Sequence, residues 1–295
     1  MANAHAPDSN AYYIPHHSKW PIIGSIALFT VMLGAIVFLN DWASSWVFLP
    51  GAVLMAIMFA GWFHDVIGEN QRGIYNNQVD RSFRMGMMWF IFSEVMFFAA
   101  FFGALFYSRV LSVPWLGGQG TKFMTNYILW PSFEAGWPVN GPGKVGGLAD
   151  SSFHVIPAFG IPALNTAILL TSGLTITIAH HALRAGKRST LTVFLALTFL
   201  LGFSFVGLQA NEYGEAYKEL GLKLSTGIYG STFFMLTGFH GLHVTVGAIM
   251  LLVIWLRVVR GHFTPERHFA FEAVAWYWHF VDVVWLGLFI FVYWL

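Results

Sequence analysis

Residues 85–106 read MGMMWFIFSEVMFFAAFFGALF, an apolar stretch with one charged residue, Glu94, near its middle. A run of about 20 apolar residues is long enough to cross a bilayer as an α-helix. At about 1.5 Å per residue, Glu94 lies roughly 13 Å along the helix, at a depth where an ionised side chain costs on the order of 3 kcal/mol. We therefore expect a functional, proton-related role for Glu94; a carboxyl group that only fixes helix packing is the alternative.

The composition is that of a membrane protein. Hydrophobic residues make up 57% of the 295 residues, charged residues only 10%, and the mean hydropathy is +0.63. Soluble domains carry about 25% charged residues. Windows of about 19 residues predict an all-α, polytopic membrane protein with seven transmembrane helices, near residues 21–39, 46–64, 85–107, 160–182, 190–209, 229–256 and 269–294.

Polar and irregular segments divide these spans into groups. A polar segment separates the first two spans from the other five, and a stretch rich in Gly, Pro and Trp follows the third span. We predict an amino-terminal segment with a two-helix bundle (1–64), an inner linker (65–84) and a five-helix bundle (85–295) with an irregular outer loop at about 108–159. Alanines at every fourth position of the second span (Ala52, Ala56 and Ala60) predict close helix packing.

Lysine and arginine indicate the orientation, because cytoplasmic loops carry an excess of both. With the amino terminus inside, ten of these residues lie on the inner side and five on the outer side. This count predicts a cytoplasmic amino terminus and an outer, periplasmic carboxyl terminus.

Several classes of function are excluded. The chain has no cysteine, which excludes disulfides, thiolate metal sites and iron–sulfur clusters held by cysteine. A net charge of +1 gives no reason to expect nucleic acid as a partner.

Histidines are the candidate metal ligands, but their spacing is not typical of a metal centre. A haem needs a facing pair on two helices, and a membrane di-iron site needs many clustered histidines. The chain shows neither pattern clearly, so we predict no metal; a histidine-ligated membrane iron enzyme is the alternative. The histidines concerned are His180, His181, His240, His243 and His279.

Two groups of ionisable residues lie at helical spacing. His279 and Asp282 are three residues apart inside the seventh span, on one helix face, and are predicted to be structural. At the inner rim, His268 and Glu272 are four apart, and His180 at the end of the fourth span can approach them. Histidine titrates near neutral pH, so this group can exchange protons; a solvated helix end is the alternative.

Arginines gather where the sixth span ends, at Arg257 and Arg260. Arginines at the end of a span usually mark only the cytoplasmic side of the membrane. Arginine can also clamp a lipid phosphate, and spacing does not decide between the two.

Several long stretches together resemble the cytochrome c oxidase subunit III family. They cover almost all of the chain after residue 62: FRMGMMWFIFSEVMFFAAFF (83–102), LNTAILLTSGLTITIAHHAL (164–183), LQANEYGEAY (208–217), IYGSTFFMLTGFHGLHVTVG (228–247) and HFAFEAVAWYWHFVDVVWL (268–286). The resemblance implies a subunit without haem or copper of its own, packed against catalytic subunit I, with subunit II in the same complex and cytochrome c as the donor. Haem and copper belong to the partner subunits.

The resemblance also implies a V-shaped cleft between the two-helix and five-helix groups that holds phospholipids, with Glu94 near it. Family members support proton uptake and the stability of the catalytic subunit. Matched residue by residue, the lipid contacts are His243 and Arg257, together with Glu69 of WFHDVIGEN (62–70). Gly68 stands where a basic residue is common in the family, and Arg72 is the candidate replacement.

The inner-rim residues His180, His268 and Glu272 match family positions near the proton-entry side. The long outer loop resembles bacterial forms, which favours a bacterial inner membrane over a mitochondrial one. A free-standing proton transporter that uses Glu94 is a further alternative.

Overall fold

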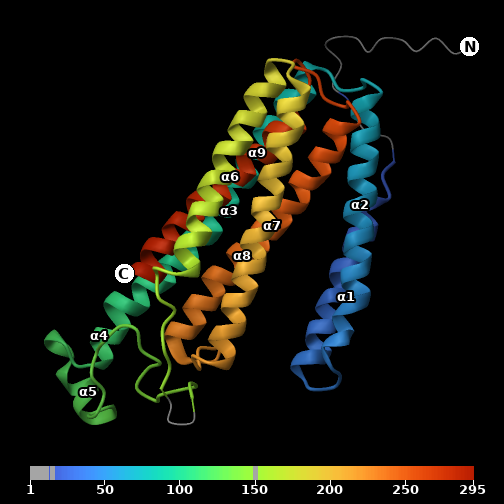
Figure 1. Cartoon of the computed structure of the whole chain (residues 1–295). Coiled ribbons are helices and arrows are strands. Elements are labelled where there is room, and N and C mark those ends of the chain that lie inside the picture. Colours follow the sequence, from blue (N-terminus) through green and yellow to red (C-terminus); the bar gives the residue numbers. More distant parts are fainter. Residues whose placement is uncertain (1–12, 14–16, 149–151) are drawn as a thin grey trace, which may run out of the picture. The chain divides into compact units, whose positions relative to one another are not determined.

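The computed structural model describes residues 13, 17–148 and 152–295, and the described chain is helical with no β-strand (Figure 1). The first part of the expected amino-terminal segment, residues 1–12 and 14–16, lies outside the described residues. Seven helices are long and apolar enough to cross a membrane: Trp20–Leu39, Ser45–Gln71, Asn77–Leu116, Ile161–Arg184, Arg188–Lys218, Gly227–Val259 and Phe269–Trp294. The predicted all-α, seven-span membrane protein is confirmed.

The chain divides into two compact units, Met1–Met85 and Gly86–Leu295. In the first unit, α1 (Trp20–Leu39) packs against α2 (Leu49–Gln71). Gly51 makes this approach close, because a Cβ there would come within 2.8 Å of the Val31 backbone nitrogen. Glycine thus provides the contact with α1, whereas Ala52, Ala56 and Ala60 are exposed within this unit.

The polar segment expected as a linker is largely helical. Residues 65–71 continue α2, and α3 (Asn77–Phe106) begins six residues after α2 ends, so residues 72–76 make the connection. The Asn76 side-chain oxygen accepts a hydrogen bond from the Val79 amide at 3.0 Å. This contact satisfies one of the free amides of the first helical turn and favours an early start of α3.

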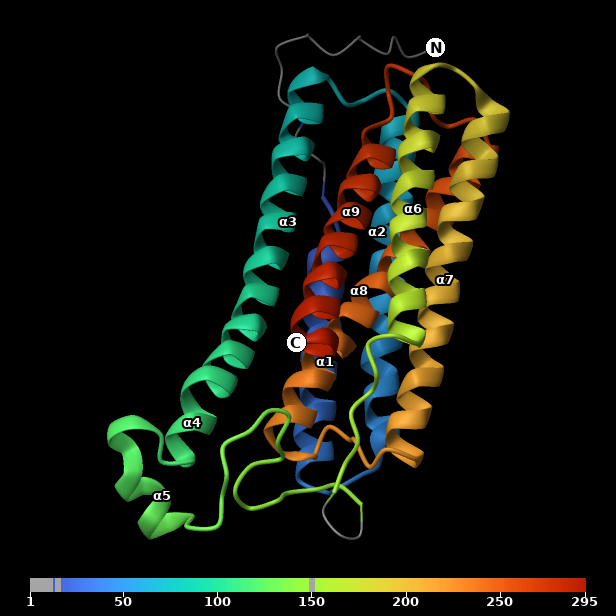
Figure 2. The ribbon, with the colours of Figure 1, turned by 60° about the vertical axis from the view of Figure 1, so that its left-hand side comes forward.

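The second unit contains the rest of α3 and the four helices α6 (Ile161–Arg184), α7 (Arg188–Lys218), α8 (Gly227–Val259) and α9 (Phe269–Leu288), which lie along one another in Figure 2. The expected outer loop contains short helical elements: a π-turn (Tyr107–Ser112), α4 (Val113–Leu116), a 3₁₀ turn (Gly120–Lys122) and α5 (Phe123–Leu129). A final π-turn (Phe289–Trp294) follows α9. The described residues between α5 and α6 form no regular helix.

Trp278 of α9 lies at the centre of the second unit, fully buried. A Cβ on Gly202 of α7 would come within 2.6 Å of its ring, and one on Gly247 of α8 within 2.9 Å. The indole N–H donates to Ser172 Oγ of α6 at 2.9 Å. Because lipid removes most of the hydrophobic drive for helix association, such close packing and interhelical hydrogen bonds hold the bundle together.

Candidate functional site

The intramembrane carboxyl group Glu94 has an ionisable partner. Glu94 Oε2 on α3 lies 2.9 Å from His243 Nε2 on α8, and the two side chains are 22% and 12% exposed. The residues are 149 positions apart in the chain, so no local pattern reveals the pair. Sequence analysis placed Glu94 in a proton-related role and His243 in a lipid contact, without joining them.

The hydrogen bonds of His243 limit the protonation states of this pair. His243 Nδ1 lies 2.6 Å from the Phe239 carbonyl oxygen, which can only accept, so Nδ1 carries a proton. The contact between Nε2 and Glu94 then needs one further proton, held by either group. In both forms the pair has no net charge, which removes most of the cost of burying the carboxyl group.

Aromatic rings surround the Glu94–His243 pair. The Phe98 ring centroid lies 5.0 Å from that of His243, and Tyr277 stacks at 6.4 Å with the planes 17° apart. This apolar surrounding strengthens the electrostatic contact relative to one in water.

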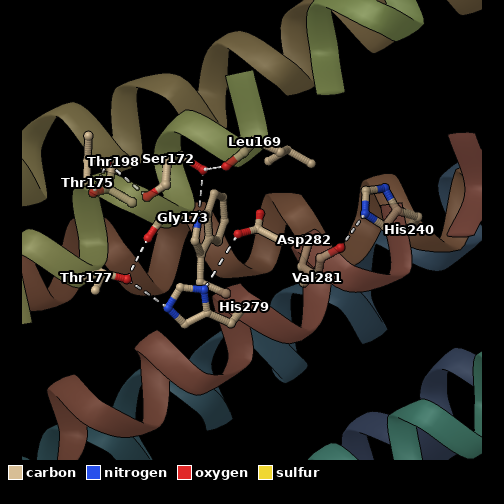
Figure 3. Close-up of polar contacts among 11 residues, drawn as sticks. Leu169, Ser172, Gly173, Thr175, Thr177, Thr198, His240, His279, Val281 and Asp282 are labelled. Atoms are coloured by element: carbon tan, nitrogen blue, oxygen red, sulfur yellow. Dashed lines mark hydrogen bonds and ion pairs between the residues drawn. The ribbon is translucent and has the colours of Figure 1, made fainter. Parts of the chain in front are cut away.

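The second predicted intramembrane pair, His279 and Asp282, lies on α9 (Figure 3). His279 Nδ1 and Asp282 Oδ2 are 3.8 Å apart, too far for a hydrogen bond. The other imidazole nitrogen lies 3.4 Å from Thr177 Oγ1 of α6. The two residues thus share one helix face, as their spacing predicts, and contact α6.

The three residues that the sequence assigns to the inner rim, here called the inner-rim cluster, lie together. Glu272 Oε1 on α9 is 3.7 Å from His180 Nε2 at the end of α6 and 3.5 Å from His268 Nε2 just before α9. Their ligand-type atoms all lie within 4.8 Å of one another. The cluster is half-buried and contains groups able to hold a proton or a cation.

Arg257, near the end of α8, is only 5% exposed. Its guanidinium carbon lies 4.5 Å from the centroid of the Phe263 ring, and its Nε and Nη2 atoms are buried without a hydrogen-bond partner among the described residues. Beyond α8, burial and the charges of Arg257 and Arg260 lower the pKa of His262. The end of α8 is therefore a region of positive electrostatic potential. There, Arg257 has two N–H groups without an acceptor among the described residues.

Glu69 and Arg72 make local contacts in the first unit. The Tyr75 hydroxyl donates to Glu69 Oε2 at 2.6 Å, and Arg72 Nε donates to the Gly68 carbonyl at 3.2 Å. Burial, together with the hydrogen bond to Glu69, raises the pKa of Tyr75. The Glu69 carboxylate therefore orders the turn between α2 and α3.

One buried acid, Glu212, is not among the residues that the sequence pattern predicts as a site. Glu212 is 1% exposed on α7, and Tyr293 donates a hydrogen bond to its Oε1 at 2.6 Å. The predicted span ended at residue 209, whereas α7 continues to Lys218. The signal was the sequence LQANEYGEAY (208–217), in which acids interrupt a helical stretch.

Similarity to known proteins extends over nearly the whole chain. A family model described as cytochrome c oxidase subunit III matches residues 10–129 and 123–295. Cytochrome c oxidase subunit 3 from Carassius auratus and from Squalus acanthias are each 40% identical to this chain over 290 residues, which is 98% of this chain and 98% of each relative. The protein of that name from Dugong dugon is 40% identical over 287 residues, 97% of both chains.

The Glu94–His243 contact predicts energetic coupling between the two side chains. In a double-mutant cycle of Glu94→Gln and His243→Phe, we expect a coupling free energy of about 0.5–2 kcal/mol, the range found for interhelical polar contacts in membranes. The measurement is the free energy of unfolding in mixed micelles titrated with SDS. A matched cycle of Glu94→Gln with Asp282→Asn, whose carboxyl group lies beside His279, is expected to be additive; equal coupling in both cycles contradicts the assignment.

Proposed function

This chain belongs to the cytochrome c oxidase subunit III family, and we propose that it is the non-redox third subunit of a proton-pumping oxidase that transfers electrons from cytochrome c to O₂. The similarity over 98% of the chain carries this proposal, since it extends through both units. Membership in the family makes the chain part of an oxidoreductase complex. Its proposed tasks are support of proton uptake, binding of phospholipid and stabilisation of the catalytic subunit.

The proposed partners follow from this role. Subunit I is in direct contact, subunit II is in the same complex, and cytochrome c is the donor. Haem and copper lie in the partner subunits, and this chain holds phospholipid and no redox centre.

We place the protein in a bacterial inner membrane, with its amino terminus in the cytoplasm and its carboxyl terminus in the periplasm. The distribution of lysine and arginine supports this orientation, and the long outer loop supports a bacterial source. A mitochondrial inner membrane is the less favoured location.

The experiment for the proposed function is purification of the chain from its native membrane in mild detergent, with identification of the co-purifying proteins. We expect a haem-containing oxidase subunit I among them. The separated chain is expected to show no Soret absorption, because the proposed role leaves haem to the partner subunits. A Soret band or stoichiometric iron in the separated chain contradicts the proposal in favour of an iron enzyme, and proton transport by the chain alone contradicts it in favour of a transporter.

Proton supply is the proposed task of Glu94 and of the cluster His180, His268 and Glu272. The Glu94–His243 pair shares a proton within the membrane-spanning region, and the cluster gathers three protonatable groups at the helix ends. Groups that lie this close can pass a proton between them and can hold it near the surface.

We expect the triple variant His180→Gln, His268→Gln and Glu272→Gln to take up protons more slowly than the parent at pH 8, where bulk protons are scarce. The measurement is stopped-flow absorption of a pH indicator while the reduced, assembled complex is oxidised. His181→Gln, next to His180 but outside the cluster, is the matched control. Identical uptake rates in all three proteins would show that the cluster is only a solvated helix end.

Lipid binding is the proposed task of Arg257, with Glu69, Arg72 and His243 as further contacts. Arginine binds phosphate through two parallel hydrogen bonds, and Arg257 has two nitrogen atoms without a hydrogen-bond partner among the described residues. The positive potential around His262 favours an anionic headgroup. His243 already has a partner for each ring nitrogen, so its proposed contact with lipid is through the ring.

We expect Arg257→Ala to release one tightly bound phospholipid from the complex, measured by native mass spectrometry. The reason is the loss of the buried guanidinium, which has two nitrogen atoms without a hydrogen-bond partner among the described residues. Arg260→Ala, which removes an exposed arginine three residues away, is expected to retain the lipid. Unchanged lipid retention in Arg257→Ala rules out the headgroup site.

A further inference from the structure

The atoms of the inner-rim cluster are arranged as in a metal site. His180 comes from the end of α6, His268 from the residue before α9 and Glu272 from the first turn of α9. One atom from each, two imidazole Nε2 atoms and a carboxylate oxygen, lies within 4.8 Å of the others. Two separate helix ends thus direct three ligand-type atoms to one point.

A second contact orients the His268 ring for coordination. His268 Nδ1 lies 3.2 Å from the Thr264 carbonyl oxygen, which can only accept, so Nδ1 carries a proton. In the neutral imidazole, Nε2 then presents its lone pair to the cluster. Metal-binding histidines generally hold their other nitrogen in this way.

Both imidazole Nε2 atoms lack the partner that a buried nitrogen requires. His268 is 9% exposed, and the Nε2 atoms of His268 and His180 are buried without a hydrogen bond among the described residues. Buried polar atoms in folded proteins nearly always have a protein, water or ion partner. A group at the centre of the cluster would satisfy both nitrogens.

The distances agree better with a shared ion than with direct hydrogen bonds. Glu272 Oε1 is 3.7 Å from His180 Nε2 and 3.5 Å from His268 Nε2. Hydrogen bonds between such atoms are about 2.7–3.2 Å long. Ligands about 2.0–2.1 Å from a tetrahedral Zn²⁺ lie roughly 3.3 Å from one another, so small side-chain movements would complete the coordination.

The donor set selects the class of ion. Imidazole nitrogen favours zinc and its neighbours in the first transition row, whereas Mg²⁺ and Ca²⁺ prefer oxygen ligands. The Glu272 carboxylate contributes negative charge, which offsets the opposing charge of the nearby Arg184. Three protein ligands leave the fourth tetrahedral position for water.

We propose that His180, His268 and Glu272 bind one divalent transition-metal ion, and that Zn²⁺ is the ion they suit best. This proposal does not depend on the proposed role in proton supply. A bound ion would occupy the same nitrogen and oxygen atoms that otherwise carry protons, so the ion and the protons compete for the site.

The test uses the purified, assembled oxidase complex, treated with a chelator and then equilibrated with Zn²⁺ alone. Bound zinc is counted by elemental mass spectrometry, and its ligands are identified by X-ray absorption at the zinc edge, where haem iron and copper do not interfere. We expect the parent to hold one more zinc per complex than His268→Gln/Glu272→Gln. The difference spectrum between the two is expected to show imidazole scattering.

Two further variants separate loss of the ligand from loss of the fold. Glu272→Gln alone preserves side-chain volume and should weaken zinc binding by more than about 100-fold, beyond the 10–100-fold typical of lost second-shell contacts. His181→Gln keeps the cluster and should bind zinc as the parent does. Equal zinc content in parent and Glu272→Gln, or a difference spectrum with oxygen ligands only, overturns the proposal.

Discussion

Lipid offers no hydrogen-bond partner, so the polar groups of a membrane-spanning chain must find partners within protein. The backbone meets this requirement by forming α-helices, in which its N–H and C=O groups bond to one another. This is why seven long helices dominate the described residues. Two of the buried acids meet it by pairing. Glu94 contacts His243, and Glu212 accepts a hydrogen bond from Tyr293.

Close packing follows from the same constraint. Because lipid is as apolar as leucine, helices associate through surface fit and interhelical hydrogen bonds. Trp278 shows both, since two glycines on neighbouring helices make room for its ring and Ser172 accepts its N–H. A large aromatic ring and a polar anchor thus define one arrangement of α6, α7, α8 and α9.

Some polar atoms without a hydrogen-bond partner among the described residues lie near helix ends, among them nitrogen atoms of Arg257, His180 and His268. Arg257 lies near the end of α8 with nitrogen atoms that make no hydrogen bond in the described residues, and the cluster of His180, His268 and Glu272 lies where α6 ends and α9 begins. Headgroups, water and ions reach this depth of a bilayer, whereas they are excluded from its centre.

The sequence by itself determined the fold class, the seven spans and the family, because a run of apolar residues long enough to cross a bilayer has few other structures available. It also predicted local neighbours such as His279 and Asp282, whose spacing places them on one helix face. The helix ends were predicted less accurately. The predicted span ended before Glu212 because this residue is polar, but α7 continues past it and Glu212 is buried against Tyr293. Only the tertiary structure joined Glu94 to His243, because contacts between helices depend on helix rotation and packing, which no local pattern encodes.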